Sequence, residues 1–287
     1  MNFEREIDLY INISTRYKRF NRIDKFYNER EQHIQWWNVL FYGILYQQIR
    51  NWRIIDMNEI IRKRKSVRKY DLTPLDETML AAVRAQIDKV KPLHSDIKYS
   101  IEIISKTKGI LGVKAPHFLI FGSEDKNGSY ENIGFIGQQL DLYFSANGLG
   151  ACWLGASKPG EAIESDLPYV IALAFGKPTE SLHRDIAEFK RKPLSTISEG
   201  SDPRIEAARL APSGMNRQSW YFIAENGKIH CYLKKPNPLV GLMLGKMGLI
   251  DLGIAICHIA QESDNFSFVK EAGAPERQGY IYNGTVI

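Results

Sequence analysis

A polar loop between two apolar segments reads Ala211-Pro212-Ser213-Gly214-Met215-Asn216-Arg217-Gln218-Ser219-Trp220. Its proline and glycine break regular structure, and the residues before and after it follow a helical and a strand pattern, respectively. The loop therefore places hydrogen-bonding side chains where the chain enters a sheet, namely Ser213, Asn216, Arg217 and Gln218. This composition favours a ligand-binding loop, and the plainer alternative is a capping turn.

The segments around this loop predict a helix followed by a hairpin. Asp202-Pro203 is typical of a helix start, and Ile205, Ala208 and Leu210 would form the apolar face of that helix. Asn226-Gly227 is the strongest short signal for a two-residue hairpin turn. This turn would join strands at Trp220–Ala224 and Ile229–Leu233. A later apolar helix is expected at Met247–Gln261, and two closing strands are expected at Phe266–Val269 and Tyr280–Val286.

The residues before the loop repeat this order of helix, strands, long helix and strand. Thr73-Pro74 predicts a helix start with Thr73 as the N-cap, and a long apolar helix is expected over 130–147, stopped by Gly148. The strands of this part are expected at 97–104, His117–Phe121, Cys152–Leu154 and Tyr169–Phe175. The similar order indicates a degenerate internal duplication, in which Asp141 and Asp251 occupy corresponding places without an assigned role.

Residues 1–56 differ in composition from the rest of the chain. They contain no alanine, no proline and one glycine, and they hold 12 of the 32 aromatic residues. The contrast favours Met57 as the start of the folded protein, with a preceding stretch that is not native to it. The alternative is a real helical extension that packs residues 31–50 on the body.

The positive charge is concentrated in one short stretch. The chain has a net charge of +5, and residues 57–69 alone carry six basic side chains and one acidic side chain. Such a localised patch indicates a specific anion. The three cysteines are far apart without a CxxC, and the histidines lack metal-ligand spacing, so we expect a cytoplasmic protein without a metal site. No apolar run approaches the roughly 20 residues that a membrane-spanning helix needs.

Three further stretches carry candidate binding residues. The first is Arg64-Lys65-Ser66-Val67-Arg68. Alternate side chains of an extended chain point the same way, so the guanidinium groups of Arg64 and Arg68 would flank the Ser66 hydroxyl, an arrangement that suits a phosphate. The alternative for this stretch is a solvated basic face or a nucleic-acid patch. A second basic cluster, which alone is typical of a solvated turn, is Lys190-Arg191-Lys192-Pro193-Leu194.

The third stretch is rich in glycine and reads Gly148-Leu149-Gly150-Ala151-Cys152-Trp153-Leu154-Gly155. It follows a helix and precedes a strand, which is the reverse of the dinucleotide-binding fingerprint. Its glycines favour a sharp turn and a close approach of the backbone to a flat group, and the alternative is a plain helix C-cap.

Taken together, the four stretches resemble the nitroreductase family of FMN-dependent oxidoreductases. That family has an R-x-S-x-R-like segment, a loop of the type A-P-S-x-x-N-x-Q-P-W, a helix ending in G-x-G-x-x-W-x-G, a strand ending in G-x-P and a basic R-x-P-L-like segment. Here the G-x-P is Gly176-Lys177-Pro178, and Ser219 stands where proline is usual. The resemblance covers residues 57–287 and implies an α+β, nitroreductase-like fold.

The resemblance also implies a role for each motif. Arg64 and Ser66, with Arg191 and Lys190, would hold the FMN phosphate, and Arg68 would lie near the N1/O2 edge of the ring. The remaining cofactor contacts would come from Lys65, Trp153, Leu154, Gly155, Pro212, Ser213, Gly214, Met215 and Asn216. Since the flavin performs the hydride chemistry, no catalytic acid, base or nucleophile is expected from the chain.

The order of the motifs departs from the family. In ordinary members the A-P-S loop precedes the G-x-G-x-x-W helix and completes the FMN site of the other subunit in a homodimer. Here the loop follows that helix. We therefore expect one chain to mimic the homodimer with two related lobes, 57–195 and 196–287, a single FMN site and a monomeric state.

The activity that the resemblance implies is that of an FMN-dependent NAD(P)H oxidoreductase. NADH or NADPH would reduce FMN, and a nitroaromatic or quinone-type acceptor would then take the electrons by a ping-pong mechanism. The expected partner is thus a small-molecule electron acceptor, without nucleic acid. Two alternatives are an FMN-binding sensor, carrier or storage protein without such turnover, and a nucleic-acid-binding protein that uses Arg62–Lys69.

Overall fold

The structure is a computed structural model that describes residues 57–109, 112–236 and 241–287. Residues 55–287 form one compact unit. We refer to residues 57–195 as the first half and to residues 196–287 as the second half. The expectations for residues 1–56 lie outside the described residues.

Four antiparallel strands form the sheet of the first half. Leu119 and Phe121 on its second strand face the large core around the long helices, whereas Phe118 and Ile120 face a smaller cluster that includes Val67. Both faces of this strand are therefore buried, as its continuous apolar run predicts. In spatial order the strands are β1 (Tyr99–Ile104), β3 (His117–Ser123), β6 (Tyr169–Gly176) and β4 (Gly150–Leu154), and a separate ladder pairs β2 (Thr107–Gly109) with β5 (Ser157–Pro159).

The second half holds a five-stranded sheet. In spatial order its strands are β10 (Phe268–Val269), β11 (Tyr280–Val286), β9 (Lys228–Lys234), β8 (Trp220–Glu225) and β7 (Ser198–Glu199). Neighbouring strands are antiparallel except β7 and β8, which are parallel. Asn226 and Gly227 turn the chain between β8 and β9 with φ of 51° and 76°. The predicted hairpin is confirmed, because a type I′ turn needs positive φ at both residues.

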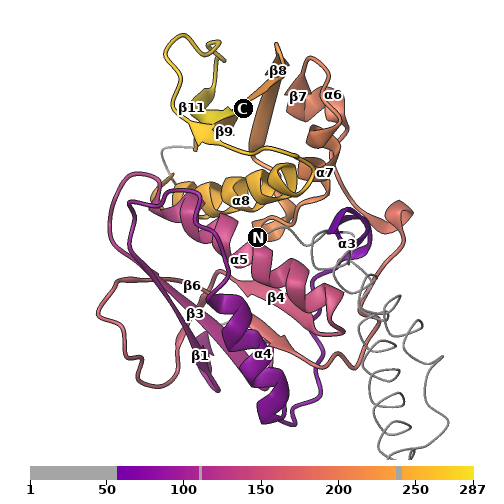
Figure 1. Ribbon diagram of the computed structural model, residues 1–287, viewed down its shortest axis with the longest axis vertical. Coiled ribbons are helices and arrows are strands. Elements are labelled where there is room, and N and C mark those ends of the chain that lie inside the picture. The colour runs from indigo at the N-terminus through magenta and orange to yellow at the C-terminus, as the bar shows by residue number, and fades with distance from the viewer. Residues whose placement is uncertain (1–56, 110–111, 237–240) are drawn as a thin grey trace, which may run out of the picture. The chain divides into compact units, whose positions relative to one another are not determined.

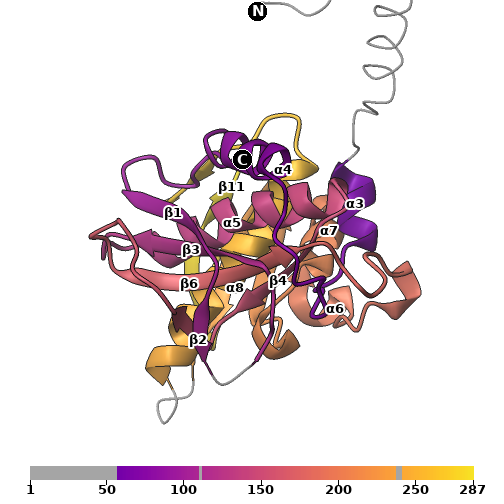
Figure 2. The same cartoon turned by 90° about the horizontal axis from the view of Figure 1, so that it is seen from below.

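Two long helices, α5 (Ser129–Ala146) and α8 (Gly241–Gln261), lie between the two sheets (Figure 1). They cross so closely that a Cβ on Gly134 would lie 2.1 Å from the Ile250 carbonyl oxygen, and a Cβ on Gly253 would lie 2.0 Å from the Glu131 carbonyl oxygen. Only glycine permits such an approach of two backbones. The view from below shows the first sheet with both helices behind it (Figure 2).

The shorter helices flank these layers. They are α3 (Met57–Lys63), α4 (Glu77–Ile87), α6 (Leu194–Ile197) and α7 (Arg204–Leu210), with single 3₁₀ turns η1 (Ile186–Glu188) and η2 (Gly214–Asn216). None of the helices in the described ranges is long and apolar enough to cross a membrane.

Among the boundaries that differ from the sequence-based prediction, three have a clear reason or consequence. The N-cap of α4 is Asp76 and not Thr73, because the Asp76 carboxylate accepts a 2.9 Å hydrogen bond from the Met79 N–H, while the preceding Leu75 N–H donates to His117. Helix α8 begins at Gly241, six residues before the predicted start, because its first turns continue the apolar run. The strand predicted over Phe266–Val269 is reduced to the two residues of β10.

Candidate functional site

The basic segment that follows α3 lies extended between β4 and the stretch 178–184. Arg64 forms an antiparallel bridge with His183, Ser66 forms a parallel bridge with Ala151, and the Val67 N–H donates to the Ala151 carbonyl over 2.9 Å. Gly150 makes this placement possible, because a Cβ there would lie 2.6 Å from the Val67 Cβ. The glycine-rich turn therefore brings the basic segment against the edge of the first sheet.

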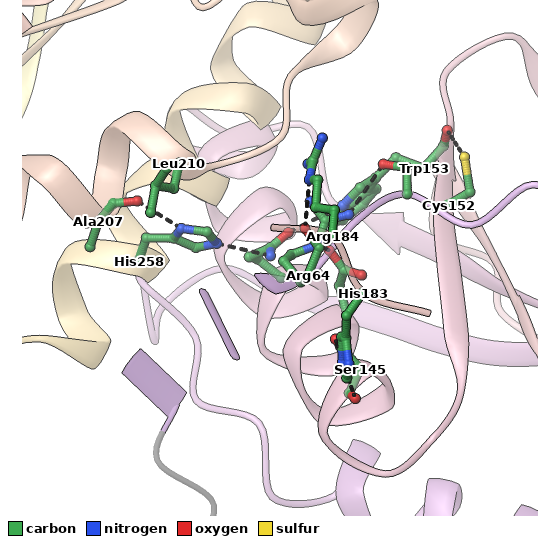
Figure 3. A network of polar contacts seen from close by, with 12 residues as sticks. Arg64, Ser145, Cys152, Trp153, His183, Arg184, Ala207, Leu210 and His258 are labelled. Carbon is green, nitrogen blue, oxygen red and sulfur yellow. Dashed lines mark hydrogen bonds and ion pairs between the residues drawn. The ribbon is translucent and has the colours of Figure 1, made fainter. Parts of the chain in front are cut away.

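Arg64 is fully buried at the centre of this arrangement (Figure 3). Its Nε lies 3.1 Å from Oδ2 of Asp141 on α5, and its Nη2 donates to the Ser66 hydroxyl over 3.1 Å. Its Nη1 is buried without a hydrogen-bond partner among the described residues. Burial raises the pKa of Asp141, and the charge of Arg64 opposes that shift. The Nε also makes no hydrogen bond beyond its ion pair, so Nη1 is the nitrogen of this buried cation that has neither kind of partner in the described ranges.

Two more guanidinium groups gather beside Arg64. Arg184 donates from Nε to the Arg64 carbonyl over 3.1 Å, and its guanidinium lies 3.9 Å from the centre of the Phe189 ring. Arg191 lies 5.4 Å from the same ring centre, and its Nε is also buried without a partner in the described part of the chain.

The pKa values of both arginines are lowered, that of Arg184 to about 10 and that of Arg191 to about 9. Burial is the main cause, followed by the positive charges of neighbouring arginines: Arg64 acts on Arg184, and Arg184 and Arg64 act on Arg191. Guanidinium groups that repel one another in a buried place favour the binding of an anion.

The loop between α7 and β8 meets the second basic cluster. Arg191 donates from Nη1 to Oδ1 of Asn216 over 2.8 Å, and Asn216 donates from Nδ2 to the Lys190 carbonyl over 2.8 Å. Gln218 is buried, and its Oε1 accepts a 2.8 Å bond from the Lys192 N–H. Two motifs that lie about 25 residues apart in the sequence therefore form one surface.

This loop has an unusual backbone. Met215, Asn216 and Gln218 have φ of 51°, 55° and 48°, in the left-handed region that disfavours residues other than glycine. Met215 is also 77% exposed. Strained residues of this kind cluster at functional sites, where the surrounding structure holds them.

An acidic side chain of α8 holds the start of the loop. Oδ1 of Asp251 accepts a 2.9 Å hydrogen bond from the Gly214 N–H, and burial raises the pKa of Asp251 to about 7. Met247, one turn earlier on α8, touches both halves: its Cε would lie 2.5 Å from a Cβ on Gly155 and 2.9 Å from a Cβ on Gly214. The glycine-rich stretch and the loop therefore meet at this methionine.

A chain of buried polar groups joins the two halves beneath the site (Figure 3). The Trp153 indole N–H donates to Oε1 of Gln138 over 3.3 Å, and Nε2 of Gln138 lies 3.1 Å from Nε2 of His258. Nδ1 of His258 lies 2.9 Å from the Ala207 carbonyl oxygen. Burial is the main cause that lowers the pKa of His258, to about 3, so this side chain is neutral at physiological pH.

Five of the predicted residues form two connected groups. Arg64 and Ser66 contact each other, while Lys190, Arg191 and Asn216 share the hydrogen bonds of the loop. Trp153 and Leu154 lie on β4, which Gly155 follows. Arg68 is exposed and donates to the Ser66 carbonyl, and Lys65 lies 3.7 Å from Glu180. Pro212, Ser213, Gly214 and Met215 lie in the loop.

Sequence reasoning missed Arg184, Asp141, Gln138 and His258 as members of this site. Arg184 belongs to no motif, and Asp141 was noted only for its place in the helix. Both ring nitrogens of His258 have partners. Over the described ranges, no group of three His, Cys, Asp or Glu side chains could hold a metal ion.

Comparison with known proteins assigns the chain to a family. Residues 56–263 match the family described as "Putative TM nitroreductase", so the chain belongs to the nitroreductase family. A solved structure from Thermotoga maritima MSB8, titled a putative nitroreductase, is 23% identical with a TM-score of 0.55, and the alignment covers 80% of this chain and 92% of that one. The α+β, nitroreductase-like fold is thereby confirmed.

More distant structures also align. A nitroreductase family protein from Clostridium difficile 630 is 16% identical with a TM-score of 0.40, over 48% of this chain and 94% of that one. An FMN-dependent nitroreductase from Clostridium difficile R20291 is 13% identical with a TM-score of 0.34, over 46% of this chain and 93% of that one. A search of curated proteins finds no match.

Proposed function

We propose that the protein is an FMN-dependent oxidoreductase that takes electrons from NADH or NADPH and passes them to a nitroaromatic or quinone-type acceptor. The observation that carries the proposal is the buried arginine cluster. Nη1 of Arg64 and Nε of Arg191 are N–H donors that lack a partner in the described part of the chain. Phosphate oxygens would accept from both, and buried donors without acceptors are costly. The residues therefore fit the phosphate end of FMN.

In this proposal Arg64, Ser66 and Arg191 hold the phosphate, with Lys190 beside them and Arg184 adding charge. Trp153 and Gly155 provide the flat wall for the ring, and the loop at Ser213–Asn216 closes the site from the second half. When bound, FMN supplies the hydride and electron transfer. The chain binds and orients the cofactor, and the exposed Arg68 provides a cation at its edge.

The proposal is tested first by the visible spectrum of the purified protein and by titration with FMN. Arg64→Ala removes a charged donor worth about 1.5–3 kcal/mol, so FMN affinity should fall roughly ten-fold or more. Arg191→Ala should act in the same direction and serves if Arg64→Ala fails to fold. The matched control is Arg62→Ala, since Arg62 is exposed and pairs with Glu262 over 3.0 Å. Equal affinity in all three variants would contradict the assignment.

An FMN-binding protein without turnover shares every one of these contacts. Steady-state oxidation of NADH and NADPH with menadione or a nitrofuran as acceptor separates the two functions. Parallel double-reciprocal plots would support the ping-pong mechanism. A flavin-loaded protein with no such oxidation would support the role of sensor, carrier or storage protein.

We also propose that the two halves are related lobes that share a single FMN site in a monomer. Gly134 faces the carbonyl of Ile250, and Gly253 faces the carbonyl of Glu131, which is the reciprocal contact that a local two-fold axis between α5 and α8 produces. This axis would relate Asp251 to Asn132, and not to Asp141 as the similar order of elements predicts. The arginine cluster has its basic residues in the first half and its closing loop in the second. FMN should therefore saturate at one equivalent per chain. Recovery of activity on mixing Arg64→Ala with Asn216→Ala chains would mean that the loop acts between chains.

Residues 57–287 should suffice for this function. The family match begins at residue 56. A chain that begins at Met57 should therefore bind FMN with unchanged affinity and melt at nearly the same temperature. A large loss of either would show that residues 1–56 contribute to the fold.

A further inference from the structure

One buried amide lies between the two ends of the candidate site. Gln138 on α5 is fully buried and is bonded to Trp153, which lies on the strand expected against the flavin ring. Gln138 also lies one turn from Asp141 on α5, and the Asp141 carboxylate pairs with Arg64 at the expected phosphate end. The amide is therefore bonded to the ring end of the site and lies beside the phosphate end.

The second half fixes the orientation of this amide. The Ala207 carbonyl can only accept, so Nδ1 of His258 carries the proton and Nε2 presents a lone pair. Gln138 must then direct its NH₂ group at His258, which leaves its oxygen to face the Trp153 N–H, a group that can only donate. A flipped Gln138 amide would place its oxygen against the lone pair of His258 Nε2 and its NH₂ group against the Trp153 N–H.

The donors and acceptors in this series of hydrogen bonds do not exchange roles with pH in the physiological range. His258 is fully buried, and besides burial the charges of Arg64 and Arg191 disfavour its protonation. The indole is also confined by packing, because a Cβ on Gly137 would lie 2.3 Å from its Cη2 and Phe121 stacks on it at 5.7 Å between ring centres. One hydrogen bond therefore selects the orientation of the Trp153 ring within a tight slot.

We propose that Gln138 and His258 are positioning residues through which the second half sets Trp153 for the cofactor. This inference rests on the proposed function, since it assigns FMN to the site. Both residues are fully buried. His258 acts through Gln138, and Gln138 acts through Trp153.

The first test needs no cofactor. The indole N–H resonance of Trp153, identified by its absence from Trp153→Phe, should shift in the FMN-free protein when Gln138→Met or His258→Phe breaks the chain. Gln139→Met is the matched control, because Gln139 bonds the backbone of Lys91 on another face of α5 and should leave that resonance in place. An unmoved resonance in both test variants would overturn the proposal.

The second test measures FMN affinity of the full-length protein. Each of the two disrupting variants should weaken FMN binding roughly ten-fold, the effect of one to two buried hydrogen bonds, whereas Gln139→Met should not. His258→Gln can donate to Ala207 and accept from Gln138, so it should restore affinity and the resonance, which also covers a folding failure of His258→Phe. Unchanged affinity in a shifted variant would overturn the link to the site. Absence of FMN binding in the wild-type protein would instead refute the proposed function and leave the first test valid.

Discussion

The two halves of the chain use the same arrangement for different polar chemistry. In each half a side chain of the long helix anchors a loop that leads into a strand of the sheet, β1 in the first half and β8 in the second. Oδ1 of Asn132 accepts from the N–H groups of Leu93 and His94 at 2.8 and 3.0 Å, while Oδ1 of Asp251 accepts from Gly214 at 2.9 Å. The first anchor is a neutral amide and the second is a titratable acid. Because Asn132 anchors its loop without a charge, anchoring does not by itself require an acid. The acid, Asp251, is the anchor that lies at the candidate site.

The largest contrast between the halves should be in their buried ion pairs. The side chains of Arg64 and Asp141 are 1% and 2% exposed, whereas those of Arg204 and Asp202 in the second half are 17% and 11% exposed. Arg64→Ala should lower the free energy of unfolding by about 3–5 kcal/mol, because it leaves a buried carboxylate unpaired. Arg204→Ala should cost about 1–2 kcal/mol. Urea unfolding without FMN measures both, and equal losses would remove the contrast.

The two anchors should differ in their response to pH. The pKa of Asp251 is about 7 in the folded protein and 3.8 in the unfolded reference. Between these values the folded state binds a proton that the unfolded state does not bind. The free energy of unfolding is therefore highest below about pH 4 and falls by up to about 4 kcal/mol as the pH rises through 7.

Asp251→Asn should remove this dependence and reproduce the neutral anchor of the first half. The measurement is the difference in the free energy of unfolding between pH 5 and pH 7.5, compared for the wild-type protein and the variant. Identical pH slopes in the two proteins would show that Asp251 ionises normally.

The glycine contacts between α5 and α8 should respond alike in the two halves. Gly134→Ala and Gly253→Ala each force a Cβ against a carbonyl oxygen, and overpacking of this kind costs about 1–3 kcal/mol. Gly245→Ala on α8 is the control, since its Cβ would meet only Pro236 at 3.8 Å. That change should be neutral or slightly stabilising in thermal melts. Unequal losses at Gly134 and Gly253 would argue against the local two-fold axis.

The smallest effect should come from the hairpin of the second half, which has no tight counterpart between β1 and β3. Gly227 has φ of 76° and open space around its Cα. Gly227→Ala should therefore cost about 1–2 kcal/mol from backbone strain alone. Chemical denaturation measures it, and a neutral result would show that the turn relaxes to another type.

Local signals predicted the elements whose reasons are local. The hairpin at Asn226-Gly227 and the helix ended by Gly148 follow from backbone preferences and apolar spacing within a few residues. The start of α4 was wrong because Asp76 and Thr73 are both good caps, and the bond of Leu75 to His117 on another strand decides between them. Short-range patterns do not contain that information.

The site could be predicted only in part for the same reason. Its motif residues carry a recognisable order, whereas its supporting residues depend on contacts between distant segments. Asp141 reaches Arg64 across 77 positions, and His258 reaches Gln138 across 120. The full burial of Arg64 follows from that packing, and the spacing of the basic segment alone suggested only a shared direction.

The backbone of the loop at Met215, Asn216 and Gln218 has a consequence for protein engineering. Glycine would adopt these left-handed conformations freely, yet the chain keeps larger residues whose side chains or neighbours tie the loop to Lys190, Lys192 and Asp251. The shape of the loop therefore depends on residues outside it. Transplanted alone into another scaffold, the ten-residue sequence would lose that shape, and a working graft must carry the second basic cluster, Lys190–Leu194, and the α8 carboxyl with it.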